Sequence, residues 1–227
     1  MTDVTYAKAF REGEREEMTR DESIFVMGTD LFLRGGHWAQ VKGLGDEFGP
    51  SRIRDAPISE AALMAAGVGS AMAGMRPIVD LNFLDFVFGA MDELANQAAK
   101  MRYMWGSDMP LVVRATTGVA LGAAQHNNSL EAWFAHLPGL HVATPATPAD
   151  AKGMIKSALR GQDPVVFLMH KALAGARGPV QLPGRGCGRT QHRAGGARGG
   201  LGALRTVHGL LPARLQPEAE DVRPVRP

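Results

Sequence analysis

Residues 140–168 read LHVATPATPADAKGMIKSALRGQDPVVFL, and this stretch has the signals of two strands joined by a helix. Thr147 offers an N-cap hydroxyl, Pro148 fits the first helical position, and Asp150 supplies an acid in the first turn. A helix is therefore predicted from this point to Arg160. The short apolar runs on either side of it predict buried strands. A strand, a helix and a second strand within about 30 residues are typical of a parallel sheet.

The earlier part of the chain repeats this alternation. Strands are predicted at 23–28, 76–80 and 110–114, and helices at 6–20, 61–74, 83–104 and 129–136. The pattern predicts an α/β fold of three layers, in which a mostly parallel sheet has helices on both faces. Ligands of such sheets bind beyond the carboxyl ends of the strands. The candidate functional residues are therefore those that follow the predicted strands.

Composition excludes several classes of protein. The chain has 227 residues, of which 45% are hydrophobic and 21% are charged, and it has one cysteine. One cysteine excludes an intrachain disulfide framework and a multi-cysteine zinc site. No uncharged apolar run reaches the thickness of a bilayer, and the charged N-terminal residues do not resemble a secretory signal. We expect a cytoplasmic protein that has no membrane partner.

Charge divides the chain near Leu173. Residues 1–173 have 16 Lys and Arg against 20 Asp and Glu, whereas residues 174–227 have nine Arg, no Lys, three acidic residues and no aromatic residue. The glycine-rich and arginine-rich second part has too little apolar surface to offset the entropy of ordering it. We expect one domain at 1–173 and a low-complexity basic tail at 174–227 that is disordered or non-native. Because no aromatic side chains alternate with its arginines, we expect no nucleic-acid partner.

Three places near predicted strand ends have side chains suited to chemistry. Glu60 stands at the start of a predicted helix, where a carboxylate either interacts with the helix dipole as a capping acid or faces a ligand. His126 lies on a loop after a strand, where an imidazole either exchanges a proton near neutral pH or has no chemical role. Phe83 and Phe86 either pack in the core or offer a flat surface to a ring. The residue types alone leave these alternatives open.

Two other patterns do not support a ligand site. Gly67-Val68-Gly69 lacks the third glycine of the dinucleotide fingerprint and falls inside a predicted helix, so we expect these glycines to allow close packing. His136 and His141 have no third metal ligand nearby in the sequence, so we do not expect a zinc site there.

A series of motifs then occurs in a fixed order along the chain. The motifs are Phe48-Gly49-Pro50-Ser51-Arg52-Ile53, Asp55-Ala56-Pro57-Ile58-Ser59-Glu60, Phe83-Leu84-Asp85-Phe86, Asn96-Gln97-Ala98-Ala99-Lys100, Gln125-His126, Glu131-Ala132-Trp133-Phe134-Ala135-His136 and Thr147-Pro148-Ala149-Asp150-Ala151-Lys152-Gly153. Through them the sequence closely resembles the beta subunit of thiamine diphosphate-dependent 2-oxo acid dehydrogenases. The resemblance covers about Thr5 to Leu173, and it is to the transketolase-like, pyrimidine-binding domain of that subunit.

The resemblance implies roles for three residues. Glu60 is expected to hydrogen-bond the aminopyrimidine ring of thiamine diphosphate, and Phe86 is expected to pack against that ring. His126 is expected to hold the substrate and to move a proton when the acyl group passes to lipoamide. The implied reaction is the oxidative decarboxylation of a 2-oxo acid, in which the cofactor accepts the electrons left by carbon dioxide. Pyruvate is the first expectation, and branched-chain 2-oxo acids and acetoin are the other substrates of similar subunits.

The resemblance also implies partners. The family holds the diphosphate through Mg²⁺ at a Gly-Asp-Gly motif, which this sequence lacks. We therefore expect a hetero-oligomer in which an alpha subunit supplies the Mg²⁺ and diphosphate site, and a lipoyl-bearing acyltransferase that takes the acyl group. The sequence departs from the family at Met169, where a glutamate is common, and at 174–227, which does not resemble the family's C-terminal domain. The alternatives are a truncated, non-catalytic interaction subunit and a fragment of the transketolase type.

Overall fold

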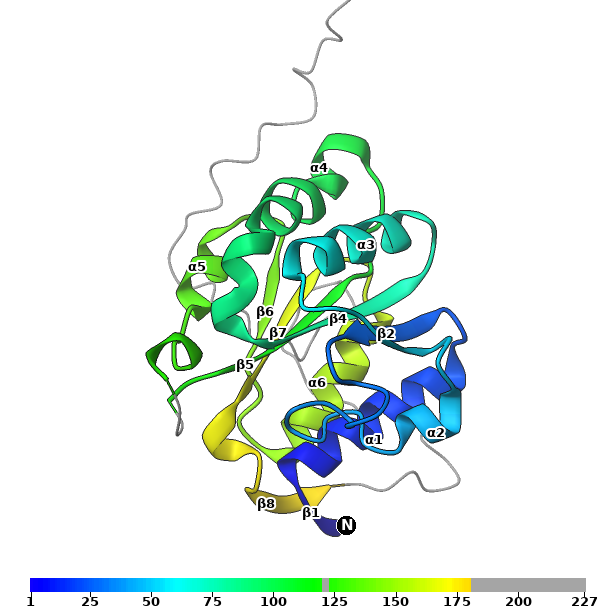
Figure 1. The fold of residues 1–227 in the computed structure, drawn as a ribbon, viewed down its shortest axis with the longest axis vertical. Helices are drawn as coiled ribbons and strands as arrows, with labels where there is room; N and C mark the ends of the chain where they lie inside the picture. The colour runs from blue at the N-terminus through cyan, green and yellow to red at the C-terminus, as the bar shows by residue number, and fades with distance from the viewer. Residues whose placement is uncertain (120–122, 181–227) are drawn as a thin grey trace, which may run out of the picture.

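A six-stranded sheet forms the centre of the molecule, and helices cover both of its faces (Figure 1). The computed structural model describes residues 1–119 and 123–180. Its strands are β1 (Thr2–Thr5), β2 (Ile24–Gly28), β3 (Ile53–Asp55), β4 (Arg76–Phe83), β5 (Val112–Thr117), β6 (His141–Ala143), β7 (Val165–His170) and β8 (Arg177–Val180). Its helical segments are α1 (Tyr6–Arg20), α2 (Leu44–Phe48), α3 (Glu60–Met72), η1 (Leu84–Ala90), η2 (Glu93–Ala98), α4 (Met101–Trp105), η3 (Ala124–His126), α5 (Glu131–His136), α6 (Pro148–Arg160) and η4 (Lys171–Leu173).

The strands of the large sheet lie in the order β3-β2-β4-β5-β7-β6, and every neighbouring pair is parallel. The predicted α/β class with a mostly parallel sheet is therefore confirmed. Because all six strands run the same way, their carboxyl ends lie along one edge of the sheet. This edge is where the segments that carry the candidate functional residues begin.

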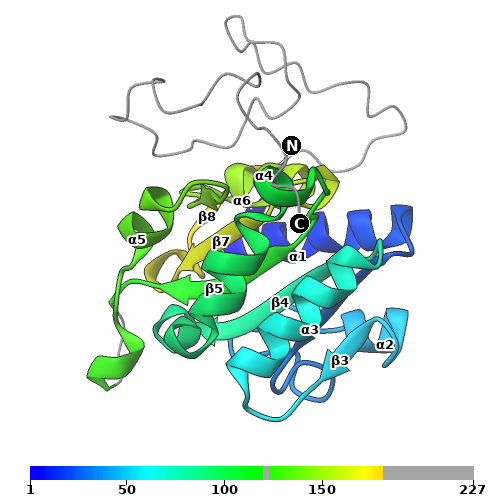
Figure 2. The same ribbon diagram turned by 90° about the horizontal axis from the view of Figure 1, so that it is seen from above.

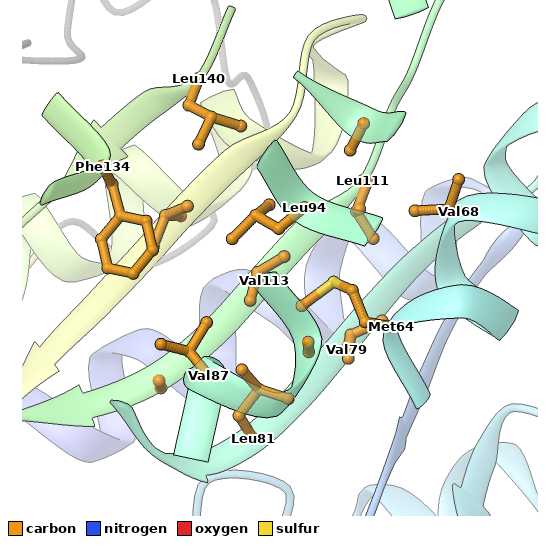
Figure 3. Packing of buried hydrophobic residues seen from close by; sticks show 14 of the residues in the cluster. Met64, Val68, Val79, Leu81, Val87, Leu94, Leu111, Val113, Phe134 and Leu140 are labelled. Carbon is orange, nitrogen blue, oxygen red and sulfur yellow. The ribbon is translucent and has the colours of Figure 1, made fainter. Parts of the chain in front are cut away.

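Two hydrophobic clusters fill the spaces between the layers, as strand alternation requires. In β2, Ile24 and Val26 pack on the side of α1, α2 and α6, whereas Phe25 and Met27 pack on the side of α3, η1 and α5. Figure 2 shows α1 and α3 on opposite sides of the sheet. Figure 3 shows the second cluster, in which side chains of α3, η1, η2 and α5 meet those of β4 and β5.

Gly67 explains how α3 lies so close to the sheet. A Cβ atom at this position would lie 2.4 Å from Cγ2 of Val79 and 3.3 Å from Cδ1 of Leu111. The close packing predicted for this glycine is therefore present. Gly69, two residues later, has no atom within 4 Å of an added Cβ and has no such constraint.

The single helix predicted at 83–104 is wrong. β4 continues to Phe83, and the segment after it is divided into η1, η2 and α4. η1 has 3-10 geometry, whose period of three matches its buried apolar side chains, which are Leu84, Val87 and Ala90. η2 widens to π geometry, and the N–H of Ala99 donates to the carbonyl of Leu94, five residues back. The chain thus changes its helical period to keep its apolar side chains on the sheet.

The helix predicted from Thr147 to Arg160 is confirmed as α6. The hydroxyl of Thr147 accepts a hydrogen bond from the N–H of Asp150 at 3.1 Å, so the predicted cap is formed. α6 packs against α1, where Gly13 lies so close to α6 that an added Cβ would be 2.8 Å from Cγ2 of Ile155. These two helices form most of one outer layer (Figure 2).

A second, two-stranded sheet joins the start of the chain to the end of the described part. β1 pairs antiparallel with β8, with Thr2 opposite Val180 and Thr5 opposite Arg177. β8 begins after the predicted boundary at Leu173, so the first seven residues of the segment 174–227 pack on the domain. The rest of the predicted tail, from residue 181, lies outside the described residues. Within residues 1–119 and 123–180, no helix has the length and apolar character needed to cross a membrane.

Candidate active site at the carboxyl edge of the sheet

The three predicted site residues follow three strands of the same parallel sheet. Glu60 is reached shortly after β3, Phe86 shortly after β4, and His126 after β5. Since these strands are parallel, the three residues belong to segments that leave the same edge of the sheet.

Phe86 and His126 are in direct contact within an aromatic cluster. The ring centroids of Phe86 and His126 are 5.4 Å apart, and those of Phe83 and His126 are 4.5 Å apart. His37 and Trp38 add to the cluster, with ring centroids 5.5 Å and 6.4 Å from that of Phe83. Edge-to-face contacts of this kind are favourable because the positive edge of one ring meets the negative face of another. Phe83 is the member that all the others touch.

A bulge in β4 sets the position of Phe83. The pairing of β4 with β5 shifts register between Asp80 and Phe83, and Asn82 has a φ of 59° in the left-handed region. The N–H of Asn82 donates to Asp80 Oδ1 at 2.7 Å, and the hydroxyl of Thr116 donates to the carbonyl of Asn82, also at 2.7 Å. Bulges re-aim the side chains that follow them. Here the bulge is fixed from both sides just before Phe83.

A buried charge cluster lies beneath this bulge. Arg114 in β5 is 1% exposed, and its Nη1 donates to Glu14 of α1 at 2.8 and 2.9 Å. Its Nε donates to Asp80 Oδ2 at 2.8 Å, and the Nε2 of Gln40 donates to the same oxygen at 2.9 Å. Burial raises the pKa of Glu14 to about 7, against the opposing effect of Arg114. The cluster links α1, β4 and β5, and through Asp80 it supports the bulge.

Asp85 and Lys171 hold the main chain around His126. Asp85 of η1 is buried and accepts hydrogen bonds from the N–H and the side-chain amide of Asn128, two residues after His126. The Nζ of Lys171, in the segment after β7, donates to the carbonyls of His126 and Gly118, the latter at 2.8 Å. Nζ of Lys171 also lies 5.5 Å from the centre of the Phe83 ring. The main chain at His126 is therefore held directly by Lys171 and, two residues later, by Asp85.

Glu60 is the first residue of α3 and is partly exposed. The turn before it is fixed because the N–H of Ala56 donates to the carbonyl of Gly28 at 2.9 Å, and because Asp55 accepts from the N–H groups of Leu31 and Phe32. Among the described residues, the Glu60 carboxylate makes no hydrogen bond or ion pair, not even to the N–H groups of its own helix. The capping alternative therefore rests on the helix dipole alone, and both carboxylate oxygens are left for a ligand.

Two hollows in the described part differ from this arrangement in size and lining. A cavity of about 10 Å³, lined by Trp38, Asp80, Asn82 and Arg114 among others, has room for one water molecule but not for an aromatic ring. A shallow groove of about 400 Å³ lies beside Trp133 and His136 on the outer face of α5. No group of three or more His, Cys, Asp or Glu side chains within the described ranges is placed to hold a metal ion.

The arrangement suits a planar heteroaromatic ligand. A carboxylate with no partner in the described part can bind a ring nitrogen, the half-buried Phe86 can pack against a ring face, and His126 can exchange a proton nearby. The sequence did not indicate Lys171, His37 or Trp38. A lysine just after a strand and two aromatic side chains in an irregular segment have no local signal that marks them as neighbours of His126.

The sequence is similar to those of several known proteins. The family model described as transketolase, pyrimidine binding domain, matches residues 2–176. The 2-oxoisovalerate dehydrogenase subunit beta of Bacillus subtilis is 43% identical over 174 residues, which cover 75% of this chain and 53% of the relative. The pyruvate dehydrogenase E1 component subunit beta of Rhizobium meliloti is 43% identical over 178 residues, covering 77% of this chain and 39% of the relative. The chain spans about half the length of such relatives.

Two further matches extend this comparison. The acetoin:2,6-dichlorophenolindophenol oxidoreductase subunit beta of Cupriavidus necator is 42% identical over 185 residues, with 76% of this chain and 54% of the relative covered. A solved structure titled as a split gene transketolase, inactive beta4 tetramer, has a TM-score of 0.61 and 22% identity, and covers 76% of this chain and 52% of that chain. At this identity the likeness shows the fold alone. The chain belongs to the family of transketolase pyrimidine-binding domains, and within that family it resembles the beta subunits of 2-oxo acid dehydrogenases.

Proposed function

We propose that the chain is the pyrimidine-binding part of a beta subunit of a thiamine diphosphate-dependent 2-oxo acid dehydrogenase, with pyruvate as the first substrate to test. The observation that carries the proposal is the position of Glu60, Phe86 and His126 at one edge of a parallel sheet, with Phe86 and His126 in contact. Matches to beta subunits at above 40% identity support the same reaction class.

The residues fit the aminopyrimidine half of the cofactor. The Glu60 carboxylate has no hydrogen-bonding or ionic partner in the described part, so it can accept a hydrogen bond from the ring without breaking an existing bond. When bound, thiamine diphosphate supplies a nucleophilic carbon and accepts the electrons released with carbon dioxide. We assign Glu60 to hold the pyrimidine ring nitrogen and Phe86 to pack against the ring.

His126 acts on the substrate side of the site in this proposal. The rings of Phe83 and Phe86 contact its imidazole, with ring centroids 4.5 Å and 5.4 Å away. We assign it to hydrogen-bond the substrate and to move a proton during acyl transfer to lipoamide. A positioned imidazole is suited to this because it can donate or accept a proton near neutral pH.

The rest of the assembly is also part of the proposal. An alpha subunit holds Mg²⁺ and the diphosphate, and the working enzyme is a hetero-oligomer that passes its acyl group to a lipoyl-bearing acyltransferase. The support is the absence of a Gly-Asp-Gly motif from the sequence, together with the beta-subunit names of the relatives. We propose a cytoplasmic setting, for which the single cysteine is the support.

The test is to co-express the chain with an alpha subunit of a 2-oxo acid dehydrogenase and to purify the complex. Decarboxylation of pyruvate and of branched-chain 2-oxo acids, and carbon–carbon cleavage of acetoin, are then measured with and without thiamine diphosphate, alongside calorimetric binding of the cofactor. We expect thiamine-dependent turnover of one substrate class, and a loss of roughly 100-fold or more with Glu60→Gln.

Glu22→Gln is the matched control, because Glu22 is exposed and precedes β2 at the opposite edge of the sheet. It should retain the activity of the wild-type complex. Full activity of Glu60→Gln would show that the role assigned to Glu60 is wrong. If the chain binds the alpha subunit but the complex shows no thiamine-dependent turnover, the result would instead support the hypothesis that this chain is a non-catalytic interaction subunit.

A further inference from the structure

Lys171 is a buried cation whose partners are main-chain carbonyls. It follows β7, and only 6% of its surface is exposed. Its Nζ donates to the carbonyls of Gly118 and His126, and among the described residues it forms no ion pair within 4.0 Å with a carboxylate. A buried ammonium without a paired carboxylate is costly, so the residue is not explained as one half of a salt bridge.

The surroundings of Lys171 have opposing effects on the stability of its charged form. Burial lowers the pKa of its ammonium, and the negative charge of Asp85 opposes this effect. The ring of Phe83, 5.5 Å from Nζ, adds a weak attraction to the cation. The Lys171 ammonium is therefore stabilised by two carbonyl oxygens, by a ring face and by a more distant carboxylate. None of these groups forms a salt bridge with it.

This arrangement fixes the position of His126. Lys171 binds the carbonyl of His126 itself, while Phe83 contacts both the His126 imidazole and the Lys171 ammonium. Asp85 fixes the chain two residues further on, at Asn128. The main chain at His126 is thus held from the end of β7, and the side chain is held by rings from the end of β4.

We propose that Lys171 is a positioning residue that acts through His126, by fixing the main chain from which the imidazole reaches the substrate. This rests on the proposed function for its catalytic meaning, but the geometric part can be tested without it. Lys171 itself has no contact with substrate or cofactor in this proposal.

The first test is spectroscopic and uses the full chain alone. The histidine ring signals are recorded by NMR with labelled histidine, and those of His126 are assigned with His126→Gln. Contact with Phe83 and Phe86 should shift the His126 ring signals away from those of exposed histidines. We expect Lys171→Met, which keeps the length of the side chain and removes its donors, to move these signals toward the exposed values.

Lys152→Met is the matched control. Lys152 is 7% exposed, pairs with Glu16 at 2.7 Å, and lies in the outer layer formed by α1 and α6. Its replacement also removes a buried ammonium but should leave the His126 signals unchanged. Unchanged His126 signals in a folded Lys171→Met chain would overturn the proposal. If Lys171→Met does not fold, Lys171→Arg provides the test instead. The guanidinium is wider than the ammonium, so it should also displace His126. Unchanged His126 signals in Lys171→Arg would overturn the proposal.

The second test measures coupling in the complex with the alpha subunit. Lys171→Met should lower kcat/KM for the 2-oxo acid roughly 10- to 100-fold, because small misplacements of a catalytic group have effects of this size. In a His126→Gln background the same change should cost less than about twofold, since residues that act through one another are not additive. Losses that multiply would overturn the proposal. If the wild-type complex is inactive, the proposed function fails, and the NMR result still decides the role of Lys171.

Discussion

The imidazole of His126 and the ring of Phe83 meet nearly edge to face, with centroids 4.5 Å apart and planes at 69°. Phe83 ends β4, and His126 lies on the segment after β5, so the contact joins the ends of two neighbouring strands. The bulge at Asn82 sets the direction of Phe83, and the buried charge of Arg114 supports that bulge through Asp80. The position of the imidazole thus depends on residues deep in the domain.

Phe83→Leu should displace the His126 ring while lowering the free energy of unfolding only slightly. The change removes edge-to-face contacts worth about 1 kcal/mol while keeping most of the apolar volume. We expect a loss of about that size in the free energy of unfolding, measured with denaturant, and a displaced His126 ring signal in the NMR spectrum. Phe88→Leu is the control, since the Phe88 ring is 48% exposed and meets Trp133 instead. An equal effect of both changes on the His126 signal would contradict this interpretation.

Gly67→Ala and Gly69→Ala should change stability in opposite directions. The new methyl group at 67 would lie 2.4 Å from Cγ2 of Val79, a β-branched side chain that cannot easily move away. Overpacking of this kind costs about 1–3 kcal/mol, partly offset by about 1 kcal/mol of helix propensity. The new methyl group at 69 has free space, so only the gain of about 1 kcal/mol applies. Thermal unfolding of the two variants checks this, and a stabilised Gly67→Ala would show that α3 can move away from the sheet.

Arg114→Met should be among the most damaging single changes in the domain. It leaves the carboxylate of Asp80 buried without its cation and removes the hydrogen-bond donor to Glu14, and breaking a buried ion pair from one side costs about 3–5 kcal/mol. We expect a drop of this size in the free energy of unfolding. Arg15→Met removes an exposed pair with Glu47 and should cost at most about 1 kcal/mol. Similar losses in the two variants would show that the buried cluster is not specially important.

Glu14 should make the stability of the domain fall as the pH rises. Burial raises the pKa of Glu14 from 4.5 to about 7, with a further rise from Asp80, while Arg114 and Arg11 oppose it. Between these two values the folded state keeps the proton and the unfolded chain releases it, so rising pH favours unfolding, by up to about 3 kcal/mol.

Glu14→Gln, which cannot titrate, isolates this effect from that of the other carboxylates. Denaturant unfolding of both proteins at pH 5 and at pH 7.5 gives the comparison. We expect the wild type to lose stability relative to the variant over this interval. A constant difference between the two proteins would mean that Glu14 titrates near its ordinary value in the folded state.

Local patterns predicted much of this fold. The cap at Thr147 and the apolar run at 23–28 depend on neighbouring residues only, and both elements formed where they were predicted, with the strand starting one residue later, at Ile24. The strand ends followed from these predictions, and with them the expectation that Phe86 and His126 lie at one edge. The glycine at 67 could be assigned to packing because its position inside a helix contradicts a phosphate loop.

Other features depend on contacts between residues that are far apart in the sequence, and such contacts leave no local signal. The helix predicted at 83–104 is divided because the bulged end of β4 and the burial of Asp85 fix how the segment must leave the sheet. The bond from Lys171 to the carbonyl of His126 joins a lysine to a main-chain atom, which has no residue preference. Arg114 within an apolar strand does signal a buried partner, but it does not say that the partner is Glu14 on α1.

The pairing of β1 with β8 has a consequence for how the protein is made. Thr2 to Thr5 leave the ribosome before the rest of this domain, yet their partner strand consists of residues 177–180. The N-terminal strand therefore has no partner until nearly the whole domain has been synthesised, and the large parallel sheet also lacks local hairpins on which to begin. β1 and β8 can pair only when translation has passed Val180. The nascent chain therefore exposes the unpaired β1 strand for most of the synthesis of the domain.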